Sequence, residues 1–137
     1  MSTERARAIV ERFFDEAWVK KNIGAWDQLP EDLVFWNFGT KIEGRDRWIQ
    51  AFVGPMSQGF PDLDVEREFT VAENDKVVVR WRGTGTHTGE FRGVAPTGKA
   101  INIAGVAIYR VVDDRIVEGW AQADTFALLT QIGAIPS

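Results

Sequence analysis

Two side chains in this sequence are suited to proton transfer. His87 is the only histidine, and an imidazole titrates closer to neutral pH than any other unperturbed side chain. Asp124 directly follows an apolar segment, where partial desolvation would adapt a carboxylate to general acid–base catalysis. The sequence therefore predicts His87 and Asp124 as catalytic residues.

Each of these residues also has a structural interpretation. Asp124 immediately precedes residues 125–132, a predicted helix, and an aspartate at that position can cap the helix. His87 precedes a glycine-containing loop, and its ring could hydrogen-bond the loop backbone at the rim of a sheet. The sequence leaves both alternatives open.

A set of polar, aromatic and small residues is predicted to bind a substrate. Asn37 and Tyr109 could orient a carbonyl or an enolate, because fixed hydrogen-bond donors stabilise a developing oxyanion; either could instead be a paired polar group of the core. In segment 115–123, successive side chains of the predicted strand point to opposite faces, so that Trp120 and Gln122 share one face and Ala121 the other. The sequence does not decide which of these faces points inward. The predicted set is Asn37, Trp81, Gly105, Ala107, Tyr109, Trp120, Ala121 and Gln122.

Composition narrows the chemistry further. The absence of cysteine excludes disulfides, thiolate nucleophiles and cysteine-ligated metals, and a single histidine excludes multi-histidine zinc sites. The acidic residues Asp62, Asp64, Glu66 and Glu68 alternate along one strand face, which indicates a solvated surface rather than a metal site. Segment 83–89, GTGTHTG, is one residue too long for a dinucleotide-binding loop. We therefore expect neither a metal nor another cofactor.

Charge and hydropathy limit the partners. The formal net charge is -4 and no basic run occurs, so we expect no nucleic-acid binding, which needs clustered lysine and arginine. No apolar run approaches the length of a membrane span. The first residues are amphipathic and include acids, unlike a signal peptide. These features predict a cytoplasmic protein, with residues 1–137 forming one domain.

The first half of the chain is predicted to be mainly helical. Residues 3–20 carry apolar side chains at three- and four-residue spacing, which is typical of an amphipathic helix. A strand is predicted at 33–38, followed by a turn at 39–44 and a helix at 45–56. The Gly-Pro pair within the last segment should distort its last turn.

The second half is predicted to be a series of long strands. Segments 63–72, 77–87, 100–111 and 115–123 alternate or are rich in β-branched residues. The alternation places His87 in phase with the apolar side of its strand. Both faces of 100–111 are apolar, so we expect helices on one face and a partner subunit on the other.

This order of elements indicates an α+β fold. We predict a cone-shaped, strongly curved antiparallel sheet wrapped around the N-terminal helices, because glycines at 83, 85, 105 and 119 interrupt the strands and favour bends. The mouth of such a cone is a natural pocket for a small molecule.

Three consecutive segments then carry a family resemblance. They are GTHTGEFRGVAPTGK at 85–99, YRVVDDRIVEGW at 109–120 and AQADTFALLTQIG at 121–133. Together with the FWNF strand and the IEGRDRWIQAF helix, they resemble the SnoaL-like polyketide cyclase family (also called ester cyclases), within the nuclear transport factor 2-like superfamily. The resemblance extends over nearly the whole chain and implies the cone-shaped fold, a cofactor-free pocket enzyme and a homodimer formed through the outer sheet face.

The resemblance also implies roles for single positions. Characterised cyclases of this family close a ring by intramolecular aldol condensation, with an aspartate of the closing strand as general acid–base. An ungapped match places that position at Ala121, and the supporting glutamine and histidine at Gly105 and Ala107. Such small residues would widen an apolar pocket, or else allow close backbone packing.

The predicted function is accordingly acid–base chemistry on an apolar, polyketide- or terpenoid-like substrate. Aldol cyclisation, isomerisation and dehydration all fit this description. The alternative is a protein that binds a lipophilic small molecule without turning it over.

Overall fold

The sheet that dominates the molecule is built mostly from the second half of the chain. The computed structural model describes residues 2–135. Its helical elements are α1 (Thr3–Phe14), η1 (Asp15–Val19), η2 (Ile23–Gln28), α2 (Arg45–Trp48), η3 (Ile49–Val53), α3 (Gly54–Gly59) and α4 (Thr125–Gln131). Its strands are β1 (Val34–Asn37), β2 (Thr40–Glu43), β3 (Asp64–Glu73), β4 (Lys76–Thr86), β5 (Ala100–Val112) and β6 (Arg115–Ala123).

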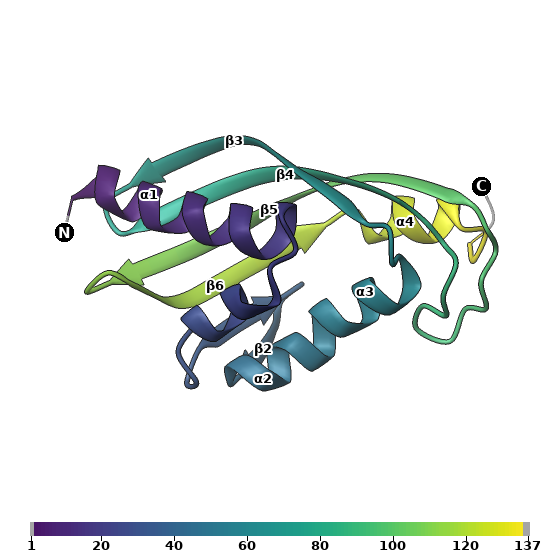
Figure 1. Cartoon of the computed structure of the whole chain (residues 1–137), viewed down its shortest axis with the longest axis horizontal. Helices are drawn as coiled ribbons and strands as arrows, with labels where there is room; N and C mark the ends of the chain where they lie inside the picture. Colours follow the sequence, from purple (N-terminus) through teal and green to yellow (C-terminus); the bar gives the residue numbers. More distant parts are fainter. Residues whose placement is uncertain (1, 136–137) are drawn as a thin grey trace.

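The fold is α+β, with N-terminal helices packed in the concavity of a curved, unclosed sheet (Figure 1). The strand order is β2-β1-β6-β5-β4-β3. All neighbours are antiparallel except β1 and β6, which are parallel, so the sheet is mixed where a fully antiparallel one was predicted. A long connection through helices and four strands separates β1 from β6, and such a connection allows the parallel direction.

The predicted turn at 39–44 is wrong, because this segment contains strand β2. Phe38 and Gly39 have positive φ angles of 51° and 86°, and they turn the chain sharply so that Thr40–Glu43 pairs antiparallel with β1. The hairpin places Asn37 at the end of β1, next to Ala121 of β6.

Both long helical segments, 3–19 and 45–59, contain a wider π-helical turn. The predicted helix 3–20 exists, but its end, η1, is π-helical. In the predicted helix 45–56 the distortion lies before Pro55, in the π-helical η3, and the helix then continues to Gly59. Proline lacks an N–H and its ring displaces the carbonyl four residues earlier, so the preceding turn takes up the change.

The inner face of the sheet forms the core with the helices. Val77 and Val79 of β4 are buried in the phase that the alternation predicted. In β5, where both faces are apolar, the structure buries the phase of Ala107 and Tyr109. They face the apolar stripe of α1, of which Val10 and its neighbours are fully buried.

A β-bulge in β3 connects the sheet to α1 through a polar cluster. Arg67 pairs with Trp81, but Phe69 pairs with Arg80, so the extra residue reverses the phase and leaves Phe69 exposed on the outer face. Arg67 lies before the bulge, on the inner face, and its side chain points towards α1.

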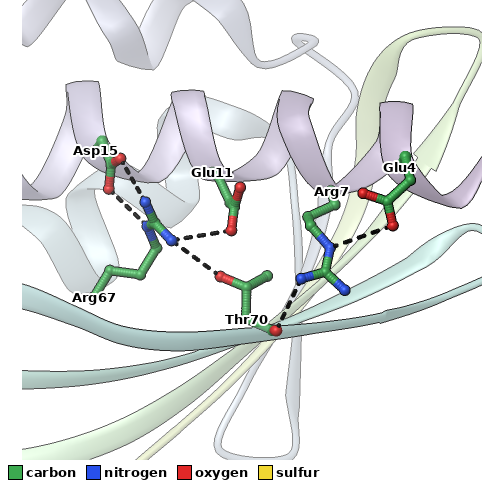
Figure 2. Close-up of polar contacts among 6 residues, drawn as sticks. All are labelled: Glu4, Arg7, Glu11, Asp15, Arg67 and Thr70. Atoms are coloured by element: carbon green, nitrogen blue, oxygen red, sulfur yellow. Dashed lines mark hydrogen bonds and ion pairs between the residues drawn. The ribbon is translucent and has the colours of Figure 1, made fainter.

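Figure 2 shows the contacts of this cluster. The Arg67 guanidinium donates to both carboxylate oxygens of Asp15, at 2.9 and 3.0 Å, and to Glu11 at 3.0 Å. Its hydrogen bond with Asp15 raises the pKa of Arg67. Arg7 donates to the Thr70 carbonyl at 3.4 Å. The bidentate contact between Arg67 and Asp15 fixes the end of α1, and with it η1, against the sheet.

None of the helices formed by residues 2–135 combines the length and the apolar character that crossing a bilayer requires.

Candidate functional site

An apolar cavity lies between the inner sheet face and the helices. Its walls come from α1, η1, the α2–η3–α3 segment and five of the strands. The lining residues are Phe14, Trp18, Phe35, Trp48, Phe52, Met56, Leu63, Val65, Trp81, Ala107, Tyr109, Ala121 and Ala123. None of them has a carboxylate or an imidazole, so the only side-chain polar atoms available in this wall are the Tyr109 hydroxyl and indole N–H groups.

The cavity is narrow. Its walls surround about 510 Å³ that protein atoms do not fill, a volume that includes space open to solvent. Only about 30 Å³ of it can hold the centre of a water molecule, which is enough for about one or two waters. A ring-sized ligand therefore requires wall side chains to move.

Two glycines on the inner face explain why the cavity is so narrow. A Cβ placed on Gly105 would lie 2.3 Å from the Trp81 ring and 2.8 Å from the Gln122 carbonyl oxygen. A Cβ on Gly119 would lie 2.4 Å from the Phe35 ring. The space that these glycines free is thus filled by aromatic rings lying directly on the backbone.

Ala107 and Ala121 form the part of the sheet that remains open to the cavity. They are paired neighbours on β5 and β6, and both line the cavity. Ala121 is also the register partner of Asn37 in the parallel pair. The position that the family resemblance assigns to a catalytic aspartate therefore faces the interior, with a methyl group in place of a carboxylate.

The other phase of β6 faces outward. Trp120 is half-buried and Gln122 is exposed, and neither lines the cavity. Trp120 is the register partner of Trp36, whose indole N–H donates to Glu118 at 3.0 Å on the outer face. Strand β6 has no bulge between residues 118 and 123, so inward Gly119 and Ala121 fix Trp120 and Gln122 on the opposite side.

Asp124 is held at the start of α4. Its Oδ1 accepts a hydrogen bond from the Ala127 backbone N–H at 2.9 Å, which is N-capping geometry. The residue is exposed and does not line the cavity. This geometry supports the structural interpretation of Asp124.

His87 is fully buried, but it belongs to the loop that follows β4. Its Nδ1 lies 2.9 Å from the Thr97 hydroxyl and accepts the Thr97 backbone N–H at 3.3 Å. Because Nδ1 accepts, the neutral ring carries its proton on Nε2, and Nε2 is buried with no partner among the described residues. Phe60, rather than a cavity residue, faces the ring, at 5.5 Å between centroids. The structure does not bring His87 and Asp124 together at the cavity.

Three further polar groups belong to the interior. Burial raises the pKa of Tyr109 far above its ordinary value, and a hydrogen bond with the Trp18 side chain opposes that shift only in part, so the phenol is neutral. The indole nitrogen of Trp48 and Oδ1 of Asn37 are buried with no hydrogen-bond partner in residues 2–135. Trp48 belongs both to the buried core and to the cavity wall.

Sequence reasoning missed the helical half of the wall. Trp18 and Phe52 lie on the π-helical turns η1 and η3, and their side chains line the cavity. Their apolar spacing in the sequence indicated that they are buried, but not that they face a cavity. Among residues 2–135, no three histidine, aspartate or glutamate side chains are placed to share a metal ion.

Comparisons with known proteins agree on one family. The family model for the SnoaL-like polyketide cyclase matches residues 8–132. A proposed SnoaL-like polyketide cyclase from Jannaschia sp. CCS1 is 30% identical, with a TM-score of 0.87 over 98% of this chain and 95% of that one. AclR of Streptomyces galilaeus, a proposed hydroxylase, is 28% identical, with a TM-score of 0.87 over 99% and 89%.

A third solved structure is IdmH of Streptomyces antibioticus, a proposed polyketide cyclase. It is 27% identical, with a TM-score of 0.78 over 93% of this chain and 98% of that one. No curated protein sequence matches the chain.

The contact between Gly105 and Trp81 gives a direct test of the cavity wall. We expect Gly105→Ala to lower the free energy of unfolding by about 1–3 kcal/mol, because the new methyl overlaps the ring and a backbone carbonyl. Combining it with Trp81→Leu should cost less than the sum of the two single changes. Gly24→Ala, whose new Cβ meets nothing closer than 3.5 Å, is the control. Chemical denaturation measures all four variants; a Gly105→Ala protein as stable as the wild type would contradict the packing.

Proposed function

The chain belongs to the SnoaL-like polyketide cyclase family, and from that premise we propose that its cavity binds an apolar, polyketide- or terpenoid-like small molecule. The observation that carries this proposal is the wall itself, which is aromatic and aliphatic on every side. Flat, unsaturated rings gain both burial and stacking energy against such a wall. The neutral Tyr109 hydroxyl supplies one hydrogen bond to a ligand oxygen.

Catalysis on the bound ligand is the second candidate function. Family membership favours it, and it would be cofactor-independent aldol cyclisation, isomerisation or dehydration. His87 and Asp124 stay the predicted proton-transfer residues, and the unpartnered Nε2 of His87 is the ring nitrogen free to act. The absence of a carboxylate from the cavity wall and the capping bond of Asp124 favour binding without turnover over this candidate.

A homodimer through the outer sheet face is part of the same proposal. Residues that are neighbours in register form an apolar stripe across β3, β4, β5, β6 and β1. The outer stripe consists of Val71, Val78, Ile108, Trp120 and Trp36. Val71 is 54% exposed, and a stripe of this kind on an antiparallel region favours cover by a second copy.

Ligand binding is tested by filling the cavity from the sheet. Ala107→Leu should weaken binding of the neutral dye phenylnaphthylamine at least tenfold, because the larger side chain takes up the remaining space. Native mass spectrometry should find a co-purifying apolar ligand on the wild type and not on this variant. Ala104→Leu, on the outer phase of the same strand, is the matched control. Unchanged dye binding by a folded Ala107→Leu protein would rule the cavity out.

Catalysis is tested at Asp124 and at Ala121, the position that the family resemblance assigns to a catalytic aspartate. If Asp124 transfers a proton, Asp124→Asn should lower turnover on a panel of polyketide and enone substrates at least a hundredfold, while asparagine preserves the helix cap. Turnover equal to that of the wild type would exclude Asp124. Ala121→Asp should create aldol activity above the wild-type background if that carboxylate is the missing group.

The oligomeric state is tested on the outer stripe. Ile108→Lys places a charge at its centre and should convert a dimer into a monomer in sedimentation-velocity experiments, because burying an unpaired charge is costly. Thr84→Lys, on the same face but outside the stripe, should leave the dimer intact. A wild-type protein that sediments as a monomer at high concentration would contradict the interface.

A further inference from the structure

A second pocket adjoins the cavity on the surface side of η1. It is lined by Ala17, Trp18, Lys21, Ile23, Trp26, Val53, Ser57, Phe60, Pro61 and Leu63. About 140 Å³ of this outer pocket can hold the centre of a water molecule, several times the figure for the inner cavity. Trp18 and Leu63 line both spaces, so the two pockets share a wall.

Trp18 is the larger part of that wall, and its position allows movement. It is half-buried, and it touches Trp26 and Phe52 edge-on, at centroid distances of 5.1 and 6.0 Å. It lies on the π-helical η1, directly before the last residue of that helix, Val19. The Trp18 side chain also hydrogen-bonds Tyr109, so displacing the ring breaks that bond as well as the two edge contacts. Short π-helical segments frequently occur at functional sites, and a half-buried ring loses less apolar burial on moving than a fully buried one.

The outer pocket differs from the cavity in carrying a cation. Lys21 lines it and has a φ of 56°, an uncommon conformation for a lysine that follows directly from the helix end. The neighbouring Lys20 is already paired with Glu16, at 3.2 Å. Lys21 forms no ion pair with any residue of the described chain.

Asp62 is the acid whose pKa the Lys21 charge influences, but the two side chains form no ion pair within the described chain. Its Oδ1 accepts the Thr86 backbone N–H at 2.8 Å. Hydrogen bonds from Thr86 are the main cause that lowers the pKa of Asp62, and the Lys21 charge is the smallest contribution. The Lys21 ammonium group therefore remains available to an anion from outside the chain.

We propose that the inner cavity and the outer pocket are two halves of one elongated ligand site, divided by Trp18, and that Lys21 binds an anionic group at the outer end of the ligand. The ligand class is then an amphipathic acid, with apolar rings inside and a carboxylate at the surface. This inference rests on the proposed function, because it assumes that the inner cavity receives the apolar part. Displacement of the Trp18 ring would join the inner cavity to the outer pocket and supply the volume for a ring-sized ligand that the narrow cavity lacks.

Two dyes that share one ring body test the charge recognition. Anilinonaphthalene sulfonate is anionic and phenylnaphthylamine is neutral. Lys21→Gln should raise the Kd of the anionic dye about fivefold, which corresponds to about 1 kcal/mol, and leave the neutral dye within twofold. Lys20→Gln, one residue away but outside the pocket, should change neither. Equal effects of the two lysine variants, or an equal effect of Lys21→Gln on both dyes, would overturn the assignment of Lys21.

The dividing role of Trp18 is tested by the rate of binding. Trp18→Ala should accelerate association of the neutral dye about tenfold in stopped-flow experiments, whereas Trp18→Phe should change it much less because a ring still separates the pockets. Circular dichroism checks that both variants fold; if Trp18→Ala does not fold, Trp18→Leu takes its place. An association rate unchanged in the folded variant would overturn the divided site.

Failure of this inference differs from failure of the proposed function. If the wild type binds neither dye, or if Ala107→Leu does not weaken the binding of either dye, the proposed function fails. If the neutral dye binds there and the Lys21 or Trp18 variants behave as the wild type, only the elongated site fails.

Discussion

The contact of aromatic rings with bare backbone on the inner sheet face determines the shape of the interior. Trp81 lies over Gly105 and Phe35 lies over Gly119, at distances that no Cβ would permit. Because the rings come this close to the strands, the helices can pack down on them, and Trp48 stacks within 4.3 Å of Phe35 between ring centroids. The result is a cavity bounded mostly by large side chains, where the small sheet residues Ala107, Ala121 and Ala123 also line the space.

The helices are positioned for this packing by one polar contact and two widened turns. Arg67, which lies on the inner phase of β3 just before the bulge, fixes Asp15 and thereby the start of η1. The π-helical turns then aim Trp18 and Phe52 at the interior, where their rings meet. A bidentate arginine–carboxylate pair is directional, so it fixes the helix end while the apolar contacts supply the burial energy.

Groups that titrate and groups that line the cavity are separate in this chain. His87 organises the loop after β4, and Asp124 caps α4, whereas the cavity offers a neutral phenol and indole N–H groups. Relatives of 27–30% identity include both proposed cyclases and a proposed hydroxylase, so the shared fold supports more than one chemistry. In this chain the cavity wall is aromatic and aliphatic, and the proposed ligand class follows from that composition.

The sequence by itself determined the fold class, the long helices, the phase of β4, and the family resemblance that the match over residues 8–132 confirmed. These features depend on local alternation and spacing, which residue types reveal directly. Only the tertiary structure decided that β1 runs parallel to β6, that a bulge turns Phe69 outward, and that Ala121 rather than Trp120 faces the interior.

The tertiary structure also decided what fills the space beside a glycine. A glycine at position 105 indicates that something approaches closely, but the sequence does not say whether that is a ligand or the Trp81 ring. Register, bulges and the filling of space are set by contacts between residues far apart in the chain, and a local pattern does not contain those contacts.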